Sequence, residues 1–430
     1  MAEFAAVVYQ NEFLPEGGTD VNAIVTVTCT GAGAASRTGS GDAGEIIIVD
    51  TSGSMGRTRM EAAKQAADAA IDQIADGTWF AVVAGTHQAY LAYPPVRSGP
   101  GMVLMDPNRR FQAHQAVQQF RADGGTAMGQ WLTLAARLFD SVSGPAGGLT
   151  KRHAILLTDG ENHNETPDQL SAAIAAVAGR FQCDCRGVGV DWQVAEVRRI
   201  AQALLGTVDI VPEPGLLQAE FASLMQASMA RGVAAADLRV WTPQGAQLLF
   251  VRQVSPSVED LTTRRTDVNA LTGAYPTGSW GDESRDYHVA VRLPAKSLGQ
   301  EQLAARVQLA VGPDVVAQSL VKARWSDDEG LTTRINPEVA HYTGQTELAD
   351  AIQEGLAAKA AGDDATATTR LGRAVQLAEA TGNAEATTRL RKVVDIDDPG
   401  TGTVRLRRDV EKADEMALDT ASTKTTRIRS

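Results

Sequence analysis

Cysteine is scarce in this chain, and positive charge is in the minority. The 430 residues include three cysteines, an odd number that argues against the disulfide framework of a small secreted domain. Cys183 and Cys185 share one face of a predicted strand, but the six histidines are too scattered to complete a zinc site. A net charge of −12 argues against a general nucleic-acid binder, which needs cationic surface to displace counterions from phosphates.

Signals for export and membrane insertion are also missing. The first twelve residues lack the basic start and the apolar core of about 7 to 15 residues that a secretory signal requires. No apolar run approaches the roughly 20 residues that span a bilayer as a helix. We therefore expect a cytoplasmic protein with no membrane span.

The most informative segment is residues 45–56, which read Glu-Ile-Ile-Ile-Val-Asp-Thr-Ser-Gly-Ser-Met-Gly. Four apolar, β-prone residues followed by a glycine-containing turn predict a buried strand of a parallel sheet. Open α/β sheets bind ligands at the carboxyl ends of such strands. Asp50, Ser52 and Ser54 would therefore lie on a ligand-facing loop, and their oxygen atoms suit Mg²⁺, which prefers oxygen ligands.

Two further segments supply oxygen side chains at predicted strand ends or turns. Residues 122–132 carry a Gly-Gly-Thr turn that ends at Thr126, and residues 153–160 form an apolar strand that ends in Thr-Asp-Gly at Asp159. In this order and spacing, the three motifs resemble the metal-ion-dependent adhesion site of a von Willebrand factor type A domain. The resemblance assigns five residues to one divalent ion, Mg²⁺ or alternatively Mn²⁺: Asp50, Ser52, Ser54, Thr126 and Asp159.

The resemblance also implies a function for the ion. In such domains the ion keeps an open coordination position that an Asp or Glu of a protein partner fills. We therefore predict a metal-dependent protein–protein interaction module in an intracellular adaptor or scaffold. A secreted or surface-associated adhesin that uses the same ion is the alternative, although no export segment or disulfide framework supports it.

An enzyme is the less favoured alternative. A divalent ion would be able to support phosphoryl transfer or hydrolysis. However, the sequence has no Gly-x-x-x-x-Gly-Lys-Ser/Thr phosphate loop, and the phosphotransferase pattern Asp-x-Asp fails because position 52 is serine. Four histidines lie near the loops of the domain, but as predicted surface or packing residues none offers a general base: His87, His114, His153 and His163. We predict no catalytic activity.

The alternation of strand and helix patterns predicts an α/β fold, a doubly wound, Rossmann-like domain over residues 44–231. Short alternating segments over 232–330 predict an antiparallel β-sandwich. The β-like segment 1–43 is too short to bury a core alone, so we expect it to join that sandwich, which makes the α/β domain an insertion. Turn signals between apolar repeats predict a helical hairpin over 331–394.

The last segment, 395–430, reads as a flexible tail rich in threonine and arginine that contains a degenerate repeat. Residues 401–407, Thr-Gly-Thr-Val-Arg-Leu-Arg, return as Thr-Lys-Thr-Thr-Arg-Ile-Arg at 423–429. Each copy places Leu406 or Ile428 three residues after a threonine, an arrangement that forkhead-associated domains favour in phosphothreonine ligands. Thr403 and Thr425 are therefore candidate phosphorylation sites, with a Ser/Thr kinase and a forkhead-associated protein as candidate partners. A solvated tail with no such role is the alternative.

Overall fold

The central strand of the α/β unit is the apolar run that precedes Asp50. In the computed structural model, which describes residues 2–35, 42–96, 101–142 and 148–428, this run forms strand β4 (Ala43–Asp50). Ile46, Ile47, Ile48 and Val49 are fully buried, as expected for a parallel strand that is covered on both faces. The predicted fold class, α/β with a Rossmann-like domain inserted in a sandwich and followed by helices, is confirmed.

The sheet around β4 has seven strands in the order β10-β9-β8-β4-β5-β6, with β7 paired to β5. Parallel neighbours of β4 are β5 (Trp79–Gly85) and β8 (Lys151–Thr158). Farther out lie β9 (Gln182–Val188) and β10 (Val208–Val211), while β6 (Ala89–Tyr93) and β7 (Val103–Leu104) run antiparallel to β5. The carboxyl ends of five parallel strands therefore share one edge of this sheet.

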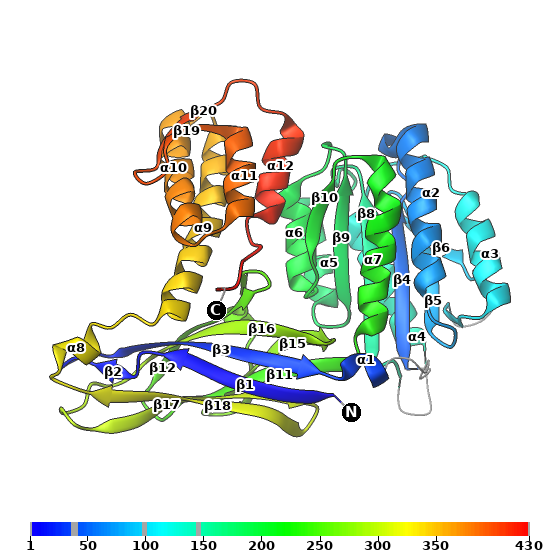
Figure 1. The fold of residues 1–430 in the computed structure, drawn as a ribbon. Helices are drawn as coiled ribbons and strands as arrows, with labels where there is room; N and C mark the ends of the chain where they lie inside the picture. Colours follow the sequence, from blue (N-terminus) through cyan, green and yellow to red (C-terminus); the bar gives the residue numbers. More distant parts are fainter. Residues whose placement is uncertain (1, 36–41, 97–100, 143–147, 429–430) are drawn as a thin grey trace. The chain divides into compact units, whose positions relative to one another are not determined.

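Helices cover both faces of the sheet (Figure 1). On the face of Ile47 and Val49, the core includes residues of α2 (Gly56–Gln73), α3 (Pro107–Gln118) and α7 (Leu217–Ala230). The other helices of this unit are α4 (Met128–Ser141), α5 (Pro167–Val177) and α6 (Val194–Ala203). Helix α2 begins six residues after Asp50, so the candidate site lies where β4 passes into this helix.

The second unit contains two further sheets, and strands from both ends of the sequence build them. One sheet has the order β1-β3-β16-β12-β13 and the other β14-β15-β11-β17-β18-β2. Strand β3 (Asp20–Thr30) pairs antiparallel with β16 (Glu283–Arg292), so the N-terminal segment joins strands that follow the α/β unit. The remaining strands are β1 (Glu3–Gln10), β2 (Phe13–Leu14), β11 (Val233–Trp241), β12 (Gln247–Ser255), β13 (Glu259–Asp260), β14 (Thr266–Asn269), β15 (Thr272–Trp280), β17 (Glu301–Val311) and β18 (Asp314–Trp325).

The C-terminal helices follow the sandwich within the same unit. After the short α8 (Glu329–Thr332) come α9 (Pro337–Ala360), α10 (Asp364–Ala380) and α11 (Ala384–Val393). Asn336, Asp363 and Asn383 cap the last three, because each side chain accepts a hydrogen bond from a backbone N–H of the first turn. In the described part of the chain, no helix is both long enough and apolar enough to span a bilayer.

The segment predicted to be a flexible tail differs from that expectation. It contains a two-stranded sheet, β19 (Val394–Asp398) and β20 (Thr403–Leu406), and helix α12 (Lys412–Ala421). Val404 and Leu418 are buried in the core of the helices, together with Leu390 of α11. The segment is mostly polar, so these few apolar positions did not stand out in the sequence. Their burial nevertheless holds the surrounding chain in an ordered structure.

Candidate metal centre

Asp50 lies at the carboxyl end of β4, fully buried, and both of its carboxylate oxygens accept hydrogen bonds. The backbone N–H of Ser52 donates to Oδ1 over 2.8 Å, and the hydroxyl of Thr158, at the end of β8, donates to Oδ2 over 2.7 Å. Thr158 was not among the residues predicted for the site, although it stands in the Thr-Asp-Gly motif. Its role depends on the pairing of β4 with β8, which the local sequence does not specify.

A chain of hydroxyl groups joins the first strand end to the second. The Ser52 and Ser54 hydroxyl oxygens are 2.8 Å apart, and the Ser54 hydroxyl donates to Oδ1 of Asp159 over 2.7 Å. Asp159 follows β8 directly and is fully buried, whereas Ser54 is exposed. Two carboxylates and two hydroxyls from segments more than 100 residues apart are thus in one continuous set.

Thr126 reaches the same place from the Gly-Gly turn. A Cβ atom at Gly160 would lie 3.0 Å from the Ser54 hydroxyl oxygen and 3.6 Å from that of Thr126, so both hydroxyls border one point. The turn is fixed to the first loop because Gly53 N–H donates to the carbonyl of Gly124 over 2.9 Å. Gly125 needs to be glycine, since a Cβ there would be 1.8 Å from the side chain of Asn164.

The loop after β8 holds this turn with side chains that the sequence did not single out. The side-chain oxygen of Asn164 accepts a hydrogen bond from Thr126 N–H over 3.0 Å. The backbone N–H of Asn164 donates to the carbonyl of Thr126, also over 3.0 Å. Asn162 accepts from Met128 N–H, and Glu165 accepts from Gly129 and Gln130 N–H at the start of α4. Thr126 is therefore positioned from both sides. A carboxylate that caps a helix from another loop leaves no local sequence signal.

Arg59 is a cation that hydrogen-bonds directly to this set of side chains. It lies in the first turns of α2, where Nη1 donates to Oδ2 of Asp159 over 2.8 Å and Nη2 donates to Oδ2 of Asp191 over 2.8 Å. The hydrogen bond to Asp159 raises the pKa of Arg59, so the guanidinium is charged at all working pH values. No local pattern singles out this arginine, because Asp159 is 100 residues away in the sequence.

Burial dominates the electrostatics of Asp50. Loss of solvent raises its pKa to about 6, although hydrogen bonds from Ser52 and Thr158 act in the opposite direction and favour the carboxylate. The negative charge of Asp159 raises the pKa of Asp50 further. A cation placed among these oxygens would relieve both the burial and the repulsion.

The donor set fits a hard divalent ion. Two carboxylates and three hydroxyls supply only oxygen atoms, the ligand type that Mg²⁺ and Mn²⁺ share. In the residues that the structure describes, no three His, Cys, Asp or Glu side chains gather into a metal-binding group, so the candidate set depends on hydroxyl oxygens beside its two carboxylates. The five residues predicted for the ion are brought together, and their binding of metal stays a prediction.

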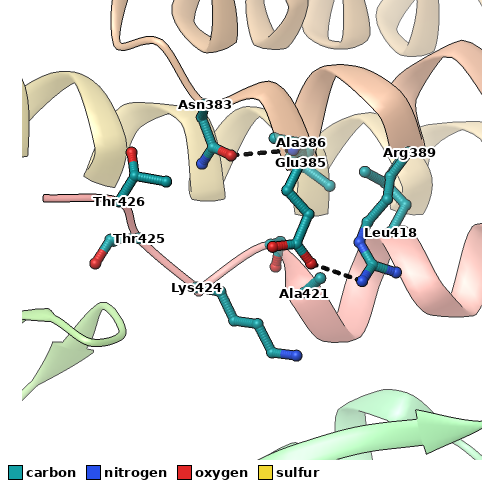
Figure 2. Close-up of a pocket in the computed structure, with 11 residues that line it drawn as sticks. Asn383, Glu385, Ala386, Arg389, Leu418, Ala421, Lys424, Thr425 and Thr426 are labelled. Carbon is teal, nitrogen blue, oxygen red and sulfur yellow. Dashed lines mark hydrogen bonds and ion pairs between the residues drawn. The ribbon is translucent and has the colours of Figure 1, made fainter.

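The two candidate phosphorylation sites lie in different surroundings. Thr403 begins β20, is exposed, and its hydroxyl oxygen is 2.9 Å from that of Thr401. Thr425 is half-buried beside a small pocket between the C-terminal segment and the helices (Figure 2). Its hydroxyl donates to the carbonyl of Val254 over 2.6 Å, and its N–H donates to the carbonyl of Pro256 over 3.0 Å. Thr403 is thus accessible, whereas Thr425 is engaged.

The opposite edge of the α/β sheet holds a second group of charges, centred on His153. Its Nδ1 is 2.7 Å from Oε2 of Glu45 and its Nε2 is 2.9 Å from Oδ2 of Asp184, and all three side chains are buried. Ser228 of α7 donates to the other Glu45 oxygen over 2.7 Å. Burial alone would lower the pKa of His153, but the two carboxylates outweigh it and raise the pKa to about 9. Burial opposes ionisation of Asp184, yet His153 and Arg231 lower its pKa.

The sequence matches two family models. One is described as the von Willebrand factor type A domain and covers residues 45–210, and the other as the von Willebrand factor type A C-terminal domain and covers residues 376–422. The second match lies in the helical region and includes α12. Both regions therefore resemble parts of the same type of protein.

Solved structures and a curated relative extend this similarity. A von Willebrand factor type A protein from Catenulispora acidiphila is 47% identical over 99% of this chain and 97% of its own, with a TM-score of 0.92. The ArnB paralog VWA2 from Sulfolobus acidocaldarius covers 98% of both chains at 15% identity and a TM-score of 0.58, a likeness of fold alone. An uncharacterized protein of Synechocystis sp. is 27% identical over 224 residues, 51% of this chain, and the chain spans 50% of that protein's length.

Proposed function

The chain belongs to the von Willebrand factor type A family, and from this premise we propose that it binds a protein partner through a divalent ion at the Asp50 corner of the sheet. A domain of this type indicates a protein interaction or adhesion module. The observation that carries the metal dependence is the meeting of oxygen side chains from three distant segments at one strand edge.

The ion would be held by Asp50, Ser52, Ser54, Thr126 and Asp159, as Mg²⁺ or Mn²⁺. When bound, it would supply an open coordination position for an Asp or Glu side chain of the partner. Two further residues of the chain would hold the ligands in place: Asn164 positions Thr126, and Thr158 orients Asp50. These hydrogen bonds favour the proposal because they fix the ligand set before any partner arrives, which lowers the entropic cost of binding.

We favour this role over catalysis because two of the four candidate histidines, His153 and His114, are bonded to carboxylates away from the ion site; His87 is the exception, since a Cβ atom at Gly124 would lie 2.8 Å from its Nδ1. His153 is buried at the opposite edge of the sheet, and His114 pairs with Asp68 and Asp72 of α2. His163 is 73% exposed and lies 3.6 Å from Glu161. A general base needs to reach the proton that it removes, directly or through one water molecule. A phosphoryl-transfer or hydrolytic enzyme therefore remains the less favoured alternative.

The second part of the proposal concerns regulation through Thr403, with Thr425 as the lesser site. A phosphate adds about −1.5 to −2 charge and three acceptor oxygens, enough to create a docking site for an arginine-lined forkhead-associated domain. Thr403 is exposed at a strand start, so a Ser/Thr kinase would reach it without unfolding the segment. Phosphorylation of Thr425 would remove its hydrogen bond to Val254 and would require this segment to detach.

The proposal places the protein in the cytoplasm as an adaptor or scaffold. The sulfur atoms of Cys183 and Cys185 lie 3.9 Å apart as free thiols, an arrangement that suits a reducing compartment. An adhesin on the cell surface is the alternative. Fractionation of the tagged protein from its host distinguishes the two locations.

Affinity capture with the full-length chain tests the metal-dependent role. We expect partners that are retained in Mg²⁺ and lost in EDTA, and that Asp50→Ala fails to retain. Asp76→Ala is the matched control, because Asp76 is an exposed carboxylate in the turn after α2 that pairs with Arg110. Equal capture by Asp50→Ala and wild type would contradict the open-site model.

A further inference from the structure

Arg59 lies in a cradle built by the loops that follow β8 and β9. Asp159 and Asp191 each accept one of its hydrogen bonds, and Gly189 lies under the guanidinium. Gly189 has a φ of +70°, and a Cβ atom there would be 3.2 Å from the guanidinium carbon, so a side chain at this position would press on Arg59. The arginine is therefore held in place and is not a surface side chain that happens to pass nearby.

The two oxygens of Asp159 have separate partners. Oδ1 accepts from the Ser54 hydroxyl, on the side of the proposed metal ligands, whereas Oδ2 accepts from Arg59. The arginine thus contacts the ligand set without occupying the oxygen that faces it. Its side chain is 28% exposed, so its charge also acts on the solvent side, from which a partner would approach.

A fixed positive charge at this position has two opposite effects. It repels a divalent cation among the five oxygens, and it attracts a carboxylate that approaches from solvent. Both effects are Coulombic, act over a few ångströms, and are weakened but not removed by salt at a partly buried site. The same arginine would therefore weaken ion binding and strengthen partner binding.

We propose that Arg59 tunes this site for an acidic partner, lowering the affinity of the site for the divalent ion while raising the affinity of the loaded site for the partner's carboxylate. The inference rests on the proposed function, since it assumes the ion and the acidic partner described above. It adds a specificity residue outside the five ligands. A purely structural role, in which Arg59 ties α2 to the loops after β8 and β9, is the competing explanation.

The test measures the two affinities separately on the full-length protein. Free Mn²⁺ is followed by electron paramagnetic resonance during a Mn²⁺ titration. An aspartate capped at both termini, N-acetyl-aspartate N-methylamide, is then titrated onto the Mn²⁺-loaded protein, and the fall in water proton relaxation reports displacement of bound water. The variants are Arg59→Gln, Arg59→Lys and the matched control Arg57→Gln, which removes an exposed arginine from the same helix turn.

We expect Arg59→Gln to bind Mn²⁺ about fivefold more tightly and the capped aspartate about fivefold more weakly. Arg59→Lys keeps the charge but not the two directed hydrogen bonds, so both of its affinities should lie between those of wild type and Arg59→Gln, whereas Arg57→Gln should stay within about twofold of wild type. If Arg59→Gln leaves both affinities unchanged, or weakens both together, the proposed role of Arg59 is wrong and the structural explanation holds. If the wild type itself binds no Mn²⁺, the proposed function fails, an outcome visible before any variant is compared.

Discussion

Strand β4 carries a buried carboxylate at each end, and the two are stabilised in different ways. Glu45 at the amino end accepts from Ser228 and lies against His153, which also contacts Asp184. Asp50 at the carboxyl end accepts from neutral groups, the backbone and side chain of Ser52 and the hydroxyl of Thr158. The pKa of His153 is raised to about 9, so the amino end contains its own cation.

This difference separates a structural group of charges from a binding site. At the amino end, each carboxylate has a charged partner within the protein, so the network is complete. At the carboxyl end, Arg59 pairs with Asp159, but Asp50 accepts from neutral groups, and hydroxyl groups lie between the two carboxylates. A hydroxyl that donates a hydrogen bond can instead present its lone pairs to a cation. We therefore expect perturbations at the amino end to change stability and perturbations at the carboxyl end to change metal binding.

Replacing His153 should give the largest effect on stability. In His153→Ala, Glu45 and Asp184 would be left buried without the imidazolium between them, which costs about 3–5 kcal/mol. Hydrogen exchange of peptides from β4 and β8 would report this loss in the α/β unit. The control His163→Ala, whose side chain is 73% exposed, should stay within about 0.5 kcal/mol of wild type. A similarly small change in His153→Ala would show that the amino-end network is not structural.

Raising the pH should produce the next largest change. The pKa of His153 is raised from 6.5 to about 9 on folding, so its contribution to stability is complete below pH 6.5 and is lost as pH rises through 9. The free energy of unfolding of the metal-free protein should fall by up to about 3 kcal/mol across this range. Urea unfolding in EDTA at a series of pH values measures the fall, and a flat or rising stability would contradict it.

Removal of Asp50 should abolish the stabilisation by metal. Wild type at Mg²⁺ concentrations 100 times the dissociation constant should gain about 2.7 kcal/mol, whereas Asp50→Ala should gain nothing. Thermal unfolding with and without Mg²⁺ provides the comparison, with Asp76→Ala as the variant that should keep the full gain. A metal-dependent shift that survives in Asp50→Ala would place the ion elsewhere.

The smallest effect is expected at the loop that positions Thr126. Glu165 accepts from two N–H groups at the start of α4, so Glu165→Ala should cost about 1 kcal/mol of stability, as for the loss of a helix cap. Glu165→Gln keeps one acceptor oxygen and should recover part of the loss. Chemical unfolding of both variants measures the difference, and equal stabilities of Glu165→Ala and wild type would mean that Glu165 does not fix the turn.

The sequence predicted the main strand and both carboxylates of the candidate site because these features are local. Each carboxylate comes at the end of an apolar run, Asp50 after the first and Asp159 after the second. Such a run predicts a strand and the place where it ends. Arg59, Asn164 and Glu165 left no comparable signal, because each acts on a residue or turn brought close only by folding.

The tail shows that amino-acid composition alone does not predict whether a segment is ordered. Its polar content predicts flexibility, yet Val404 and Leu418 are buried, and Thr425 bonds to Val254. The two copies of its repeat therefore differ, because one begins a strand and the other is an extended segment bonded to the chain near Pro256. A repeated sequence does not imply a repeated environment.

The sequence by itself determined the alternation of parallel strands and helices in the α/β unit and the oxygen-bearing residues at the strand ends, since periodicity and turn chemistry depend on neighbours along the chain. Only the tertiary structure decided which of those oxygens meet, which cation stands beside them, and how the N-terminal strands join β16. The physical reason is that hydrogen bonds and charges act over a few ångströms in space, whatever their separation in sequence.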